Sequence, residues 1–275
     1  MKTLRIGTIA TVVCGGITLG LAQSARADLI VNGGFEATTG STTGGQLGYN
    51  VNATGWSTTG YNFLFTPGTA DTTGTVGSDG ALYLWGPGNG SANGLPATSP
   101  AGGNYVAADG AYEQGPITQT LSGLTVGAQY NVSFYYAGAQ QHGYTGANTE
   151  QWQVSFGSST QDTPVLNNAS EGFTGWQSES FTFTADATSD VLAFLAIGTP
   201  PTGVPPFSLL DGVTANEVPP VPTPEPSSLI GGGLVLLERN PHLMRHLWPS
   251  APFYNHRRRS AAARRCPPRH PASRG

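Results

Sequence analysis

The chain has 275 residues and a formal net charge of −4. All twelve Lys and Arg lie outside residues 28–237, a segment that holds fifteen Asp and Glu. Such a segment repels nucleic acid and anionic lipid head groups, so we expect neither as its partner, whereas divalent cations and neutral polymers lose nothing by meeting negative charge. Cys14 and Cys266 are the only cysteines, which excludes a fold stapled by several disulfides.

Residues 1–27 have the pattern of a secretory signal peptide. Lys2 and Arg5 precede an apolar run over residues 6–21, and Ala25-Arg26-Ala27 supplies a small-x-small cleavage site. Cleavage there would remove Cys14 and leave a mature chain that begins near Asp28. The segment 28–217 is long enough for one domain that buries roughly 70% of its unfolded surface.

Short strands separated by Gly- and Pro-rich turns are predicted along the first half of this domain. The expected strands cover residues 29–36, 56–65, 81–85 and 104–109, and loops cover 37–55 and 86–103. The clearest element is 115–138, which predicts two strands joined as a hairpin. Tyr130, Val132, Phe134 and Tyr136 alternate there with polar residues, the pattern of a strand with one face on a core.

The second half continues in the same way and contains no amphipathic helix before Pro219. Residues 151–156 and 176–185 alternate, 191–197 is apolar on both faces and is placed centrally in a sheet, and 207–215 closes the domain. The pattern predicts an all-β fold, an antiparallel β-sandwich. Long, uneven loops favour a jelly roll over a barrel.

Residues 218–228 form a proline-rich linker, 229–237 are apolar but too short to cross a bilayer as a helix, and 238–275 form a basic tail expected to be disordered. Pro224, Glu225 and Pro226, followed by this apolar run, resemble the PEP-CTERM sorting signal of bacterial extracellular proteins. That resemblance implies processing by an exosortase in a bacterium that builds exopolysaccharide. The run departs from the family by stopping halfway, at Glu238, and the tail resembles the product of a frameshift.

The domain is similar to galactose-binding-like and carbohydrate-binding jelly rolls over residues 29–216. The motifs are LIVNGGFE at 29–36, ITQTLSGLTVGAQYNVSFYYAG at 117–138 and LLDGV at 209–213. The resemblance implies a structural Ca²⁺ ion held by Glu36 and Asp211 together with backbone carbonyls. Carboxylate and carbonyl oxygens are the ligands that Ca²⁺ prefers.

Aromatic and amide side chains in loops are the candidate ligand-binding residues. Flat rings stack on the apolar faces of pyranose sugars, while amides bond the hydroxyl groups. The loops supply Tyr49, Tyr61, Tyr112, Tyr144 and Gln141. Other aromatics, including Trp85, are expected in the core, and His142, the domain's one histidine, is expected as a solvated loop residue.

Three functions agree with these observations. The first is an exported, non-enzymatic β-sandwich of a Gram-negative bacterium, at the cell surface or in the exopolysaccharide matrix, that binds carbohydrate weakly. The second is a glycoside hydrolase or lyase that uses a carboxylate pair such as Asp109 and Glu113. The third is a structural matrix protein without a small ligand. No Ser-His-Asp arrangement, phosphate-binding glycine loop or oxyanion-stabilising cation is recognisable, which favours a non-enzyme.

Overall fold

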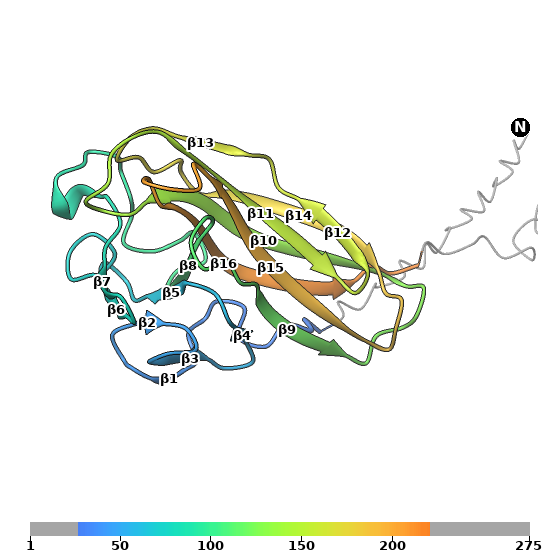
Figure 1. Cartoon of the computed structure of the whole chain (residues 1–275). Helices are drawn as coiled ribbons and strands as arrows, with labels where there is room; N and C mark the ends of the chain where they lie inside the picture. The colour runs from blue at the N-terminus through green and yellow to red at the C-terminus, as the bar shows by residue number, and fades with distance from the viewer. Residues whose placement is uncertain (1–26, 221–275) are drawn as a thin grey trace, which may run out of the picture. The chain divides into compact units, whose positions relative to one another are not determined.

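The computed structural model describes residues 27–220, and the regular structure among them is almost entirely β-strand, joined by turns and long loops (Figure 1). In chain order the strands are Thr38–Gly40 (β1), Gly45–Gln46 (β2), Val51–Ala53 (β3), Ser57–Thr58 (β4), Asn62–Phe65 (β5), Thr75–Gly77 (β6), Gly80–Leu82 (β7), Tyr105–Asp109 (β8), Ile117–Ser122 (β9), Gln129–Gln140 (β10), Asn148–Phe156 (β11), Ser159–Asp162 (β12), Leu166–Asn168 (β13), Gln177–Thr184 (β14), Ser189–Thr199 (β15) and Pro206–Glu217 (β16). Helical structure in this part of the chain is one 3₁₀ turn, Pro87–Asn89, and no helix there is long and apolar enough to cross a bilayer.

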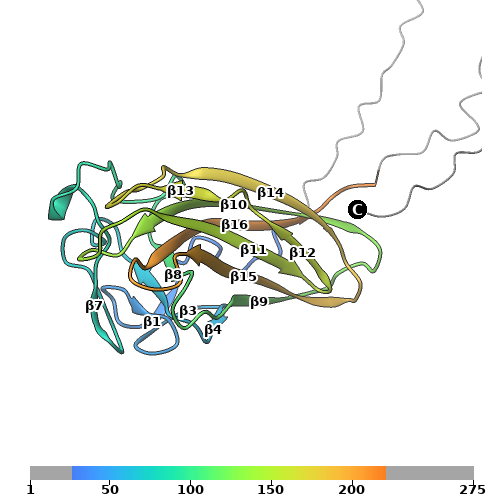
Figure 2. The same cartoon turned by 45° about the horizontal axis from the view of Figure 1, so that its top comes forward.

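Two antiparallel sheets pack face to face (Figures 1 and 2). The first has the order β14-β10-β16-β8-β5-β2, and the second has the order β12-β11-β15-β9-β4, with β13 paired to β11. Strands β1 and β3, and strands β6 and β7, form two further two-stranded sheets. The domain is therefore the predicted all-β sandwich of jelly-roll type, and β15, predicted to be central, lies between β11 and β9.

The main core lies between the sheets because the strands alternate as the sequence predicts. Tyr130, Val132 and Phe134 of β10 are buried there against Val154 and Phe156 of β11. Trp152 of β11 crosses this core, and its indole Nε1 donates to the carbonyl oxygen of Leu209 at 2.9 Å. This bond ties β11 to β16 of the opposite sheet and so holds the two layers in one arrangement.

A second apolar cluster covers the outer face of the first sheet. In β8, Val106 and Ala108 belong to the main core, whereas Tyr105 and Ala107 belong to the second cluster, so successive residues face opposite sides. Leu82, Leu84 and Leu95, from β7 and the loop after it, pack onto this outer face. The long connection between β5 and β8 therefore acts as a cover, and β8 is buried on both faces.

The predicted hairpin at 115–138 is wrong. Strand β9 pairs with β15 in the second sheet, and β10 pairs with β14 and β16 in the first. The turn between them, which includes Gly123 and Gly127 at positive φ, carries the chain from one layer to the other. In Figure 2, β9 runs along the lower side of the sandwich and β10 along the upper side. Alternation shows which face of each strand is buried, but two strands that face one core have the same pattern whether they share a sheet or oppose each other.

Two further strand predictions are wrong. Residues 29–36 form no strand, although this segment is held against β16 by the bonds Leu29 N–H to Ala215 O and Val213 N–H to Gly33 O. Residues 56–65 divide into β4, in the second sheet, and β5, in the first. The expected loop 37–55 contains the short strands β1 to β3.

The predicted signal peptide, the sorting motif at Pro224, Glu225 and Pro226, the apolar run 229–237 and the tail 238–275 lie outside the described residues. Of the proline-rich linker, only residues 218–220 are described. These interpretations stay predictions.

Candidate functional site

A cleft of about 410 Å³ opens at one end of the sandwich. Its walls come from the residue before β5, the turn between β6 and β7, the loop after β8, the β10–β11 loop and the β15–β16 loop. The side chains are Tyr61, Asp79, Ala81, Asp109, Ala111, Tyr112, Gln141, Tyr144 and the segment 200–205. Clefts of this size are typical of small-molecule sites in proteins.

Four of the five predicted ligand-binding residues meet in this cleft: Tyr61, Tyr112, Tyr144 and Gln141. Tyr112 and Tyr144 are 49% and 41% exposed, whereas Tyr61 is almost wholly buried. The rings of Tyr61 and Tyr112 meet edge to face, with centroids 5.2 Å apart. The buried Tyr61 ring therefore helps to orient the exposed ring of Tyr112.

Tyr112 is also joined to the β6–β7 turn, because its hydroxyl donates to Asp79 Oδ2 at 3.3 Å. The charge of Asp79 is the main cause that raises the pKa of Tyr112. Burial, followed by the charges of Asp79 and Asp109, raises the pKa of Tyr61 to about 12. Both tyrosines therefore keep their hydroxyl protons at neutral pH. The Tyr112 proton is bound to Asp79, and the Tyr112 hydroxyl oxygen can still accept a hydrogen bond.

Asp109 is the buried carboxylate of the cleft, 3% exposed at the end of β8. Its Oδ1 accepts the backbone N–H groups of Ala111 at 2.8 Å and Tyr112 at 3.0 Å, which closes the turn that carries Tyr112. Burial raises the pKa of Asp109 to about 6, although these two bonds lower it. Glu113, its predicted partner, is not among the residues that line the cleft, where the second carboxylate is Asp79.

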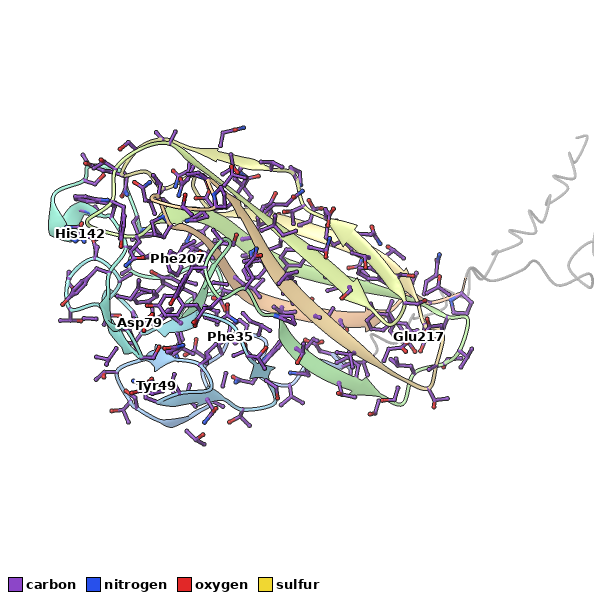
Figure 3. All side chains as sticks on the ribbon, viewed as in Figure 1. Phe35, Tyr49, Asp79, His142, Phe207 and Glu217 are labelled. Carbon is purple, nitrogen blue, oxygen red and sulfur yellow. The ribbon has the colours of Figure 1, made fainter. Side chains whose placement is uncertain are left out.

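Tyr49 does not join the other four. It lies in the turn between β2 and β3, is 64% exposed, and lines neither this cleft nor a smaller one of about 150 Å³ near Trp56. In Figure 3, Tyr49, Asp79 and His142 lie toward the same end of the molecule, with Tyr49 lowest and His142 highest, so nearness to this end does not by itself place a residue in the cleft. The sequence selected Tyr49 because it is an aromatic in a Gly-rich loop, and that criterion carries no information on which loops converge.

Sequence reasoning missed an aromatic group beside the cleft. His142 packs against Trp85 with ring centroids 4.2 Å apart and against Tyr83 at 6.4 Å. Trp85, expected in the core, is partly exposed, and its Nε1 donates to the carbonyl oxygen of Tyr144 at 2.8 Å. The spacing of Tyr83 and Trp85, two residues apart and therefore on one face, is the signal that could have revealed this group.

The two carboxylates of the predicted Ca²⁺ site lie close together. A Cβ atom built on Gly34 would be 3.8 Å from Asp211 Oδ1 and 3.9 Å from Glu36 Oε1. Glu36 Oε1 accepts the Asn104 N–H at 2.8 Å, and the Ser99 hydroxyl donates to Asp211. Asp211 is fully buried, and its pKa is raised to about 7, chiefly by burial and in smaller part by the charge of Glu36.

Residues 27–220 contain no group of three or more His, Cys, Asp and Glu side chains suited to a metal. A cation bound by Glu36 and Asp211 would therefore need hydroxyl and backbone oxygens as well. The Ser99 hydroxyl, which contacts Asp211, is one such oxygen, and the chain at Gly103, where a Cβ atom would collide with Glu36 Oε1, brings a loop backbone against the pair. The donor set thus fits a hard cation such as Ca²⁺.

A family model described as "Protein of unknown function (DUF642)" matches residues 89–205. This match spans β8 to β15, together with the Tyr112 and Tyr144 loops of the cleft. Among curated proteins, none matches the sequence.

Solved structures similar to this chain include several carbohydrate-binding modules. TmCBM61 in complex with beta-1,4-galactotriose is 15% identical, with a TM-score of 0.36 over 70% of this chain and 100% of that one. The CBM22-1 xylan-binding domain of Paenibacillus barcinonensis Xyn10C is 14% identical, with a TM-score of 0.34 over 73% and 100%. A cleaved adhesin domain of Lys-gingipain from Porphyromonas gingivalis is 14% identical, with a TM-score of 0.35 over 69% and 98%. Similarity at this level does not transfer a ligand.

Proposed function

We propose that this chain is a carbohydrate-binding β-sandwich that takes neutral polysaccharide in the cleft at the end of its sheets. The observation that carries the proposal is the convergence of Tyr61, Tyr112, Tyr144 and Gln141, from three separate segments, on one cleft. Half-exposed tyrosines offer flat apolar surface for sugar rings. Gln141 and the tyrosine hydroxyls offer hydrogen bonds, so the cleft has both kinds of contact that a sugar requires.

The charge of the domain narrows the ligand to neutral glycans. Residues 28–220 contain no Lys or Arg, and the cleft holds Asp79 and Asp109. Uronate or sulfate groups would meet these carboxylates without a compensating cation. Neutral sugar hydroxyls, in contrast, can donate to carboxylate oxygens.

Affinity electrophoresis in gels that contain one polysaccharide each tests the proposal. We expect the full-length chain to be retarded by at least one neutral polysaccharide. Polygalacturonate and heparin can be bound by the nine Arg of residues 238–275, so any retardation by them in the presence of EDTA should be unchanged by variants in the cleft. The double variant Tyr112→Ala/Tyr144→Ala should run unretarded, while Tyr49→Ala, an exposed tyrosine outside the cleft, should behave as wild type. Equal retardation of the double variant and wild type would place the binding elsewhere.

The proposal includes a structural Ca²⁺ ion at Glu36 and Asp211. It is supported by two neighbouring carboxylates, one fully buried, in a domain with no Lys or Arg to balance them. An ion bound there would join the segment before β1 to β16. Added Ca²⁺ should raise the thermal midpoint of the EDTA-treated chain by several degrees, and Asp211→Asn should reduce that rise. An equal rise in wild type and the variant would exclude Asp211 as a ligand.

We also propose that the protein is exported to the surface or extracellular matrix of a Gram-negative bacterium through its signal peptide. Sorting by an exosortase would act on Pro224, Glu225 and Pro226. The support is the sequence pattern at the two ends of the chain. Fractionation of expressing cells tests it: protein kept in the cytoplasm, with an uncleaved N-terminus, would contradict export.

One observation favours the alternative, a glycoside hydrolase. Asp109 has a pKa raised to about 6 and shares the cleft with Asp79, and catalytic acids are tuned in this way. The turn that Asp109 closes already gives this carboxylate a structural role, so we propose binding without hydrolysis. Release of reducing ends from a bound polysaccharide, abolished in Asp109→Asn, would instead establish the enzyme.

A further inference from the structure

The core between the two sheets ends in a polar layer. The inward-facing row of β11 is apolar at Trp152 and beyond, but its first two members are Asn148 and Glu150. Opposite them, the inward row of β10 ends in Gly138 and Gln140, and the β13 residue paired with Asn148 is Asn168. Amide and carboxyl groups thus replace hydrocarbon at the end of the core that lies beneath the β10–β11 loop.

The side chains of this layer are buried but incompletely hydrogen-bonded. Glu150 is 0% exposed, and its Oε1 receives only a long bond, 3.3 Å, from Asn168 Nδ2. Glu150 Oε2 has no partner, and neither Oδ1 nor Nδ2 of Asn148, which is 3% exposed, has one. Buried polar atoms are nearly always paired, so three unpartnered atoms on neighbouring side chains point to a ligand.

Room for the carboxylate is made by a glycine. A Cβ atom built on Gly138 would lie 2.3 Å from Glu150 Oε2 and 3.0 Å from Thr174 Cγ2. The oxygen therefore points across the interior to the opposite sheet, where no larger residue fits. Oε2 is placed between the two layers and away from the solvent-facing side of β11.

An ionised carboxylate in this place requires a positive partner. Taking a charge out of water is strongly unfavourable unless the charge is paired, and residues 28–220 provide no Lys or Arg. Burial raises the pKa of Glu150 to about 8, although its bond from Asn168 lowers it. A cation bound beside such a desolvated carboxylate would stabilise its ionised form more than it would at the protein surface, because little water screens the two charges.

We propose that Glu150, Asn148 and Asn168 form a buried Ca²⁺ site between the sheets, separate from Glu36 and Asp211. The Glu150 carboxylate and the Asn148 amide oxygen are hard donors, which suit Ca²⁺. Asn168, whose Nδ2 faces Glu150, would turn its amide to present Oδ1 to the ion. The absence of His and Cys from the group disfavours zinc and copper. The remaining ligands would be backbone carbonyl oxygens and water, as is usual for this ion.

An ion here would join the elements that carry one wall of the cleft. Gln140 Nε2 donates to the carbonyl oxygen of Gly146 at 2.7 Å, and the Gly146 N–H donates to Ser170 Oγ at 2.8 Å. The β10–β11 loop, which bears Gln141 and Tyr144, is thus tied to the layer that holds Glu150. The ion would connect the ends of β10, β11 and β13 beneath this loop.

Counting bound ions in the background of the other site tests the proposal. We expect equilibrium dialysis of the metal-stripped, full-length Asp211→Asn chain against Ca²⁺ to give about one ion per chain, and Asp211→Asn/Glu150→Gln to give none. Asp211→Asn/Asp162→Asn, which removes an exposed carboxylate from β12, should keep the ion. The proposal is overturned if Glu150→Gln leaves the number of bound ions in the Asp211→Asn background unchanged.

A variant that adds a carboxylate keeps the proposal testable if Glu150→Gln fails to fold. Asn148→Asp places a second carboxylate beside Glu150, so the full-length variant should have a lower thermal midpoint than wild type in EDTA. Added Ca²⁺ should then raise its midpoint more than that of wild type. If the polar layer binds only water, Ca²⁺ will raise both midpoints equally, and that result also overturns the proposal.

Discussion

Asp109 in the cleft and Glu150 in the polar layer are both buried carboxylic acids whose pKa values burial raises, to about 6 and about 8. They differ in their hydrogen bonds. Asp109 accepts two short bonds from backbone N–H groups of its own turn, whereas Glu150 has one long amide contact and an oxygen without a partner. Burial alone therefore does not identify a ligand site. What distinguishes Glu150 is that one of its carboxylate oxygens lacks a hydrogen-bond partner, and the other has only a long one, although both lie in a closed interior.

Of the substitutions that test this difference between Asp109 and Glu150, we expect Gly138→Ala to have the largest effect on stability. The new methyl group would collide with Glu150 Oε2, which has no solvent to move into, so we expect a loss of about 1–3 kcal/mol of stability. Denaturant unfolding of Gly138→Ala, Glu150→Ala and the double variant measures the coupling. Gly138→Ala should cost at least about 1 kcal/mol less when Glu150 is already truncated.

The matched control for Gly138→Ala is Gly143→Ala, which adds the same methyl group in the exposed β10–β11 loop. Gly143 has a φ of +91° and no atom within 4 Å of a built Cβ, so the cost is backbone strain alone, about 1 kcal/mol. This cost should be the same with and without Glu150→Ala. If Glu150→Ala changed the cost of Gly138→Ala and the cost of Gly143→Ala by the same amount, the polar layer would not differ from the cleft in how tightly it is closed around Glu150.

The next effect is a pH dependence of stability that belongs to Asp109. Its pKa is about 6 in the folded chain and 3.8 as a free group, so the folded chain binds the proton more tightly. The stability from this proton is fully present below about pH 4 and is lost as the pH rises through 6. Asp109→Asn removes that dependence, so the difference in unfolding free energy between wild type and variant should change between about pH 4 and 6 only. Urea titrations at several pH values measure it, and a constant difference across that window would contradict the assignment.

Tyr112 separates stacking from hydrogen bonding in the cleft. Its ring is half exposed, and its hydroxyl bond to Asp79 is long at 3.3 Å, so Tyr112→Phe should keep affinity for a bound polysaccharide within about twofold. Tyr112→Ala loses the stacking surface, worth about 1 kcal/mol, and should weaken binding roughly fivefold. Isothermal titration with a soluble oligosaccharide of that polysaccharide gives both values. A larger loss in Tyr112→Phe than in Tyr112→Ala would show that the hydroxyl, and not the ring, is the main contact.

Alternation in the sequence predicts which side chains of β10, β11 and β15 are buried, because each strand turns every second residue toward the core. The same alternation, extended two and four residues before Trp152, would have placed Glu150 and Asn148 on the inward face. Pairing is harder to predict, since β9 and β10 carry the same pattern as a hairpin although they lie in different sheets. Which loops converge was not predictable either, because Tyr49 and Tyr144 lie in loops of similar composition, and only long-range packing separates them.

The smallest effect is expected from Trp85→Phe, which changes the cleft without touching the polar layer. The Trp85 indole N–H holds the carbonyl of Tyr144 at 2.8 Å on an exposed surface, where one such bond contributes only about 0.5 kcal/mol. We expect about a twofold loss of oligosaccharide affinity, because Tyr144 is positioned less firmly, and an unchanged number of bound Ca²⁺ ions. Isothermal titration and equilibrium dialysis of the same preparation measure the two quantities. A variant that loses Ca²⁺ together with affinity would mean that the β10–β11 loop and the layer beneath it act as one unit.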